Sequence, residues 1–262
     1  MKRYIKIYLK LLHLSWASLI MYRANFINSI ISANVWCFFN LLTVLFLTAK
    51  TSSVLGWSRE ELILLIGVSN IVVGIFYFLF SISLYEFANI VNLGTLDAIL
   101  LKPIDSQFAL SLWIASFQSL ARVIFGIGVT TIILVQLHIS PTPLNILIFL
   151  ALVIFSTVLQ YTIWFGVTTI TIKFTTLSNI NELLYHTNDF TRFPPEMFRA
   201  GRELLYFILF PFTLIAVVPV KTLLQKATII DIFWLLLVSC LFFYLSRKFF
   251  QFTLRFYTSA SG

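Results

Sequence analysis

The chain has 262 residues, of which 60% are hydrophobic and 11% charged, with a mean hydropathy of +0.96 and a formal net charge of +8. A soluble domain is about half apolar and a quarter charged, so this composition excludes a soluble globular protein and a disordered chain. Both cysteines, Cys37 and Cys240, sit inside apolar runs, which excludes a secreted disulfide scaffold.

Residues 1–22 predict a basic amphipathic helix rather than a cleaved signal. Lys6 and Lys10 interrupt any apolar core, and helical spacing places them with Arg3 opposite an apolar face that includes Trp16. Such a helix is suited to lie on a negatively charged membrane surface. The alternative is an ordinary basic leader to the first span.

Six apolar runs follow, and each is a candidate membrane span. A spanning helix needs about 20 mostly apolar residues, and in hydrocarbon it must satisfy its own backbone polar groups. The runs are Phe26–Thr48, Leu62–Tyr85, Phe108–Leu137, Leu144–Ile172, Leu204–Val218 and Ile229–Leu245. The loops are too short to fold separately, so we expect one all-α polytopic membrane domain, 1–262.

Most Lys and Arg residues fall in loops on one side of these runs if Lys173–Glu203 is a loop on that side. Positive loops face the cytoplasm, which predicts a cell-membrane protein with both termini cytoplasmic. The basic residues follow this rule instead of forming a patch, so no nucleic-acid partner is expected.

Several kinds of chemistry are missing from the sequence. There is no glycine-rich phosphate loop, so the chain should not bind ATP itself, and no Cys/His cluster has metal-ligand spacing. The three histidines, His13, His138 and His186, are far apart. We therefore expect no catalytic residue and no cofactor bound by this chain, although an intramembrane enzyme or a membrane assembly protein remain alternatives of another class.

Small and polar residues inside the spans indicate close helix packing. Gly67 and Gly74 predict one packing face. A second stripe contains Ser111, Ala115, Ser119, Arg122 and Gly126. We expect the intramembrane Arg122 to pair with a carboxylate, with Glu182 and Asp189 as candidates, or else to extend toward the membrane surface.

The segment 86–107, EFANIVNLGTLDAILLKPIDSQ, predicts two short helices separated by a break. Gly94 permits the turn, and Asp97 lies in the first turn of the second helix, where it favours the helix dipole. Pro103 ends that helix, and Asp105 or Ser106 can cap the third span.

This segment resembles the permease subunits of ABC-2 type transporters, in particular a six-span branch of similar length. The matching residues are Gly94, Leu96, Asp97, Leu100, Leu101, Lys102 and Pro103. The resemblance implies that the cytoplasmic segment, from Glu86 onward, is the coupling segment that presses on a separate ATPase. The alternative is a loop that merely joins two spans.

A second segment, 193–224, resembles the same branch. The matching pairs are Phe193-Pro194, Met197-Phe198, Leu204-Leu205, Pro211-Phe212, Val218-Pro219 and Leu223-Leu224. The resemblance implies that 194–224, with Pro194, Pro211 and Pro219, is an external re-entrant pair of helices. Residues 174–193 then form a polar fifth span, whereas hydropathy alone makes them a cytoplasmic loop.

A polar face would run along that fifth span. Asn179, Glu182, His186 and Asp189 recur at three- and four-residue steps and so share one helical face. Intramembrane ionisable residues usually mark a pathway, so we expect this face, with Arg122, to line a translocation path that attracts cations. The alternative is a cytoplasmic amphipathic helix whose charges face water.

The resemblance implies a permease subunit of an ATP-driven exporter. Its partners would be two ABC ATPase subunits, which bind ATP and Mg, and a second permease chain, either identical or related. The expected substrate is a small hydrophobic or amphipathic molecule, such as a cationic drug in multidrug efflux. A lipid or lipid-linked glycan is the alternative substrate.

Overall fold

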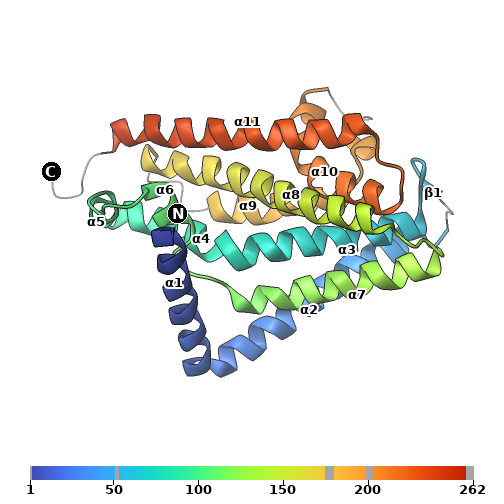
Figure 1. The fold of residues 1–262 in the computed structure, drawn as a ribbon, viewed down its shortest axis with the longest axis horizontal. Coiled ribbons are helices and arrows are strands. Elements are labelled where there is room, and N and C mark those ends of the chain that lie inside the picture. Colours follow the sequence, from blue (N-terminus) through green and yellow to red (C-terminus); the bar gives the residue numbers. More distant parts are fainter. Residues whose placement is uncertain (1, 51–52, 175–179, 199–202, 258–262) are drawn as a thin grey trace.

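The computed structural model describes residues 2–50, 53–174, 180–198 and 203–257. These residues are almost entirely helical, with one short antiparallel pair of strands (Figure 1). The elements in chain order are α1 (Lys2–Met21), α2 (Arg23–Leu47), β1 (Ser53–Val54), β2 (Trp57–Ser58), α3 (Arg59–Phe76), η1 (Tyr77–Ser81), α4 (Ile82–Asn92), α5 (Leu96–Leu100), α6 (Ser106–Ser111), η2 (Phe117–Ser119), α7 (Leu120–Gln136), α8 (Pro143–Thr169), η3 (Ile170–Ile172), α9 (Ile180–Thr187), η4 (Asn188–Arg192), η5 (Pro195–Phe198), α10 (Glu203–Leu223), α11 (Ile229–Thr253) and η6 (Leu254–Phe256).

Within the described residues, five helical segments are long and apolar enough to cross a membrane. They are Arg23–Leu47, Arg59–Asn92, Phe117–Gln136, Pro143–Ile172 and Ile229–Phe256. A shorter apolar helix, Leu209–Leu223, is part of α10. The prediction of an all-α, multi-pass membrane protein is confirmed, whereas a sixth span stays a prediction.

The long helices α3, α7, α8 and α11 run side by side, and α1 crosses their direction steeply near α6 (Figure 1). The central helix is α3, which is buried along most of its length between α7, α8 and α10. By contrast, α2 and α11 lie at the periphery and expose most of their apolar side chains. A membrane protein is expected to show such a pattern, because lipid covers the outer helices.

The core has two parts. The larger part is aliphatic and lies between α3, α7, α8 and α10. The smaller part is aromatic, and its fully buried rings include Phe76, Phe87, Trp164 and Phe165. The aromatic core lies beneath α4, α5 and α6, and so supports the segment predicted to face an ATPase.

The run Phe108–Leu137 is not one continuous helix, which corrects the prediction of a single long third span. The chain leaves the helical conformation after α6 and resumes it at η2. Side chains from other elements satisfy the backbone at this break. The amide of Ile114 donates to Ser83 Oγ at 2.9 Å, and the amide of Ala115 donates to Ser15 Oγ at 3.1 Å.

A wide helical turn in η1 supports the same break. The segment Tyr77–Ser81 is a π-helix, whose i→i+5 pattern redirects backbone carbonyls. The Phe78 carbonyl accepts the amide of Ser116 at 2.9 Å. Hydropathy alone cannot reveal the break, because its polar partners come from elements distant in sequence.

Glycines allow α3 and α7 to pack with their backbones almost in contact, as the small-residue stripes predicted. A Cβ atom on Gly126 would lie 2.6 Å from the Gly67 carbonyl oxygen and 2.9 Å from the Ile71 amide nitrogen. A Cβ atom on Gly74 would lie 2.7 Å from a methyl group of Val123. The close approach therefore requires glycine at these positions.

We expect Gly126→Ala to destabilise the protein by about 1–3 kcal/mol, because the added methyl group forces two backbones apart. The measurement is the apparent melting temperature in detergent. Gly128→Ala is the matched control in the same helix, since no atom lies within 4 Å of the added Cβ. Equal melting temperatures for the two variants would contradict the packing role.

Candidate functional site

The segment between α4 and α6 has the predicted arrangement of helix, break and helix. Gly94 ends α4 with φ of +69°, a left-handed conformation that favours glycine, and α5 follows at once. Leu96 and Ile99 are buried and fix α5 to the aromatic core. On its outer side, Leu101 is 85% exposed. The segment is thus firmly anchored and presents an apolar side chain outward.

The polar residues of this segment also have defined surroundings. Lys102 is exposed, and its Nζ lies 4.7 Å from the centre of the Trp113 ring. Glu86 is half-buried and accepts a hydrogen bond from Asn89 Nδ2 at 3.0 Å. Pro103 is exposed and follows the end of α5. The half-buried Asp97 lies near Tyr257, whose pKa is raised by burial and by this carboxylate.

Asp105 ties the segment to α11 and to α1. Its side chain caps α6 by accepting the Phe108 amide at 3.0 Å, and its carboxylate pairs with Arg247 at 2.6 Å. Burial alone would raise the pKa of Asp105, but the Phe108 amide and the Arg247 guanidinium lower it below its usual value. The Asp105 amide donates to the Tyr4 hydroxyl at 3.2 Å. A movement of this segment would therefore be transmitted to α11 and α1 through these contacts.

A second group of polar residues lies within the bundle, centred on the buried Asn188 of η4. Its Oδ1 accepts hydrogen bonds from Gln160 Nε2 at 2.6 Å and from Trp164 Nε1 at 3.1 Å. Its Nδ2 donates to the Tyr77 hydroxyl at 2.6 Å. One side chain thus joins η4 to α8 and to the π-helix η1.

Two arginines extend this cluster toward α2 and α7. Arg192 binds Asp189 at 2.7 Å and also donates to Asn40 Oδ1 on α2. Arg122 is only 8% exposed, and its guanidinium carbon lies 5.1 Å from the centre of the Tyr77 ring. A cation over an aromatic face is stabilised by the ring quadrupole. The cluster therefore holds two positive charges and one negative charge.

The residues predicted to share one polar face have different surroundings in the structure. Asn179 lies outside the described residues, and Glu182 and His186 are exposed on α9. Only Asp189 reaches the polar cluster, where it pairs with Arg192. Among the described residues, no carboxylate lies within ion-pair distance of Arg122, so neither Glu182 nor Asp189 is its partner. Asp189 is satisfied by the arginine one turn further along the chain instead.

Sequence reasoning missed Asn188, Gln160 and Tyr77 as members of this cluster. Gln160 is a polar residue inside a long apolar run, which was the available signal. Asn188 is next to Asp189, but it faces a different side of the helical turn. No pattern in the sequence connects these three positions, because they lie on three separate elements.

The end of the bundle opposite α5 is held by contacts between loops and helices. Trp57 Nε1 donates to Glu196 Oε2 at 3.2 Å, which connects the β1–β2 hairpin to η5. Lys226 pairs with Glu61, and Lys221 pairs with Asp231 at 3.2 Å.

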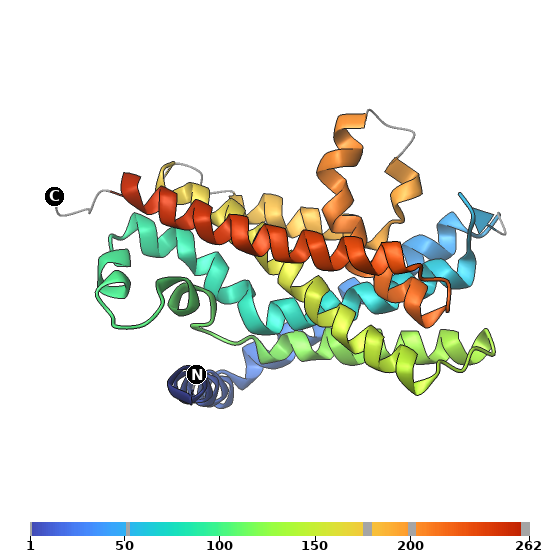
Figure 2. The same ribbon diagram turned by 45° about the horizontal axis from the view of Figure 1, so that its top comes forward.

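The three prolines of the predicted re-entrant segment lie in two settings. Pro194 is buried between η4 and η5, while Pro211 and Pro219 are inside α10. Figure 2 shows η5 and the first part of α10, in orange, standing out from the layer of long helices. Proline lacks a backbone N–H donor, so Pro211 and Pro219 each leave one carbonyl of α10 without its helical hydrogen-bond partner.

Across the described residues, no group of three or more His, Cys, Asp or Glu side chains is placed to hold a metal ion. Cys37 is buried and donates from Sγ to Asn70 Oδ1 at 3.2 Å. The polar groups of the bundle are therefore arranged to bind one another and to line helix interfaces.

A family model described as ABC-2 family transporter protein matches residues 34–261, which is most of the chain. No curated protein and no solved structure matches it significantly.

Proposed function

Because the chain belongs to the ABC-2 transporter family, we propose that it is the permease subunit of an ATP-driven exporter in the cell membrane. Two separate ATPase subunits would bind ATP and Mg and supply the energy. A second permease chain, identical or related, would complete the path. The chain itself is a membrane transport component. It would alternate between two conformations that bind the substrate differently, and the ATPases would shift the equilibrium between them.

The segment from Glu86 to Pro103 carries this proposal. It has an exposed leucine, Leu101, directly after a short helix that is packed into the aromatic core through Leu96 and Ile99. The Asp105–Arg247 pair links the same region to α11. A displacement of α5 by an ATPase would therefore be transmitted to the long helices through these contacts.

The proposed topology has six spans with both termini cytoplasmic. The polar fifth span would include α9 and η4, since Asn188 is bonded to Gln160 and Trp164 well inside α8. Segment 194–224 would form the external re-entrant part, where Pro211 and Pro219 are tolerated because α10 is largely buried in protein. The crosswise, basic α1 would lie on the cytoplasmic membrane surface (Figure 1).

The proposed substrate is hydrophobic or amphipathic and would pass near the polar cluster. A cationic group would compete with Arg192 for Asp189, after first meeting the exposed Glu182. In this exchange Arg192 would lose its carboxylate partner only while substrate is bound. The exchange would distinguish a cationic substrate from lipid, because it depends on the carboxylate of Asp189, whose partner Arg192 can be replaced.

Glu182→Gln combined with Asp189→Asn should reduce export of a cationic dye about tenfold, because both carboxylates lose their charge. The measurement is ATP-driven dye transport in membrane vesicles, with ATPase association measured in parallel. Glu60→Gln, at the opposite end from α5, is the control and should transport normally. Unchanged dye export in the double variant, with assembly intact, would exclude this path.

Copurification tests the proposed function most directly. Tagged permease extracted gently from its native membrane should retain a stoichiometric ATP-binding protein, because the coupling segment needs one to act on. Addition of ATP and Mg should change the permease's accessibility to proteolysis. If the permease emerges without an ATPase in several mild detergents, the exporter proposal fails, and an assembly protein becomes the better interpretation.

A further inference from the structure

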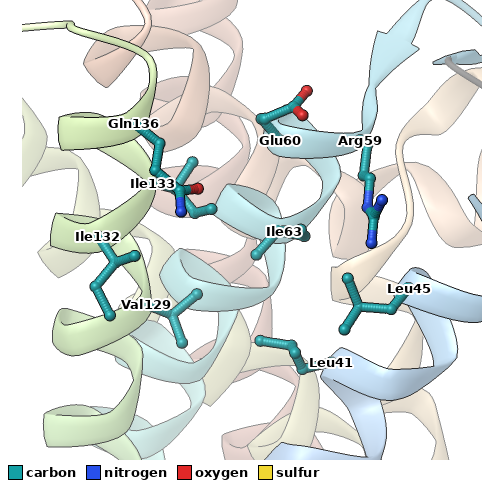
Figure 3. Close-up of a pocket in the computed structure, with 9 residues that line it drawn as sticks. All are labelled: Leu41, Leu45, Arg59, Glu60, Ile63, Val129, Ile132, Ile133 and Gln136. Carbon is teal, nitrogen blue, oxygen red and sulfur yellow. The ribbon is translucent and has the colours of Figure 1, made fainter.

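A groove with apolar walls opens between α2, α3 and α7 (Figure 3). Its volume is about 370 Å³. The apolar lining consists of Leu41, Leu45, Ile63, Val129, Ile132 and Ile133. The groove also opens sideways, because Ile132 on its wall is 59% exposed. In a membrane-spanning chain, this side faces the hydrocarbon of the bilayer.

Polar side chains lie only at one end of the groove. Arg59 and Glu60 come from the first turn of α3, and Gln136 is the last residue of α7. Figure 3 shows the guanidinium of Arg59 and the amide of Gln136 pointing into the groove, whereas the carboxylate of Glu60 points away from it. This polar end of the groove, its mouth, therefore directs hydrogen-bond donors at whatever fills the groove.

The position of this mouth matches the depth of lipid headgroups. Arg59 begins a membrane-spanning segment and Gln136 ends another, so both lie near a membrane surface. Leu41 lies six positions before the end of α2, which places it about 9 Å deeper at 1.5 Å per residue. The groove therefore runs from headgroup level into the hydrocarbon.

We propose that this groove binds one membrane phospholipid. Arg59 and Gln136 donate hydrogen bonds to the phosphate, and one acyl chain lies against Leu41, Ile63 and Val129. Arginine is suited to this role because its planar fork binds two phosphate oxygens at once. The acyl chain fills a gap beside α2, a helix that buries little of its surface in protein. The proposal depends on the membrane topology and not on the transport function.

The experiment uses native mass spectrometry of the purified full-length permease. The two probes are phosphatidylglycerol and diacylglycerol with identical acyl chains, so they differ only in the phosphate headgroup. The wild-type protein should retain one phosphatidylglycerol about tenfold more strongly than diacylglycerol, because a charged hydrogen bond contributes this much. No ATPase is needed, so the result is independent of the exporter proposal.

Three variants separate the contributions of headgroup and groove. Arg59→Gln should lose the preference for phosphatidylglycerol, whereas Glu60→Gln, one residue further on but pointing away, should keep it. Val129→Phe fills the groove and should reduce binding of both probes. Equal retention of the two probes by the wild type, or equal effects of Arg59→Gln and Glu60→Gln, would overturn the proposal.

Discussion

Leu101→Asp should reduce permease-dependent stimulation of the partner ATPase about tenfold. Leu101 is the most exposed leucine of the proposed coupling segment, and a buried apolar contact at an interface centre contributes about 2 kcal/mol. A charge at this position would have to be desolvated against the ATPase surface. The measurement compares ATP hydrolysis by the ATPase subunits with and without permease reconstituted in lipid nanodiscs.

Ile229→Asp is the matched control for this experiment. Ile229 is 86% exposed, similar to Leu101, but it begins α11 at the end of the bundle opposite α5 (Figure 1). Both variants should fold, because neither removed side chain supports the core. Full stimulation by the Leu101→Asp protein would make the segment a simple connection between spans and remove the main support for coupling.

Asn188→Leu should lower the apparent melting temperature by roughly 5 °C and abolish export. The substitution leaves the amide of Gln160 and the indole of Trp164 without their acceptor, at a cost of about 2 kcal/mol in total. The Tyr77 hydroxyl loses a donor as well. Thermal unfolding in detergent, followed by intrinsic fluorescence, measures the loss of stability.

Asn34→Leu provides the comparison. Among the described residues, the Asn34 side chain donates only to the Ile30 carbonyl of its own helix, so its replacement should leave the melting temperature nearly unchanged. If Asn188→Leu were equally harmless, the hydrogen bonds around Asn188 would contribute nothing to joining η4 to α8. The polar segment would then be free to leave the bundle as a loop.

The sequence alone determined the features that depend on local composition. Long, continuously apolar runs of about 20 residues specify membrane helices, because a helix satisfies its own backbone polar groups in hydrocarbon. Gly94 defines the break before α5, because glycine frees the backbone at its position. Pro103 defines the end of α5, because proline restricts the backbone at its own position. Gly67 and Gly126 indicated close packing, since small residues at helical spacing allow two backbones to approach. Each of these inferences needs only neighbouring residues.

The tertiary structure decided everything that depends on a distant partner. The third apolar run breaks near Ile114 because Ser83 and Ser15 supply hydrogen bonds from two other helices. Arg122 lies against Tyr77 instead of a carboxylate, because Asp189 already has Arg192 in its own turn. Hydrogen bonds and ion pairs between helices follow from how the helices are arranged in space. Hydropathy and spacing along one segment carry no information about that arrangement.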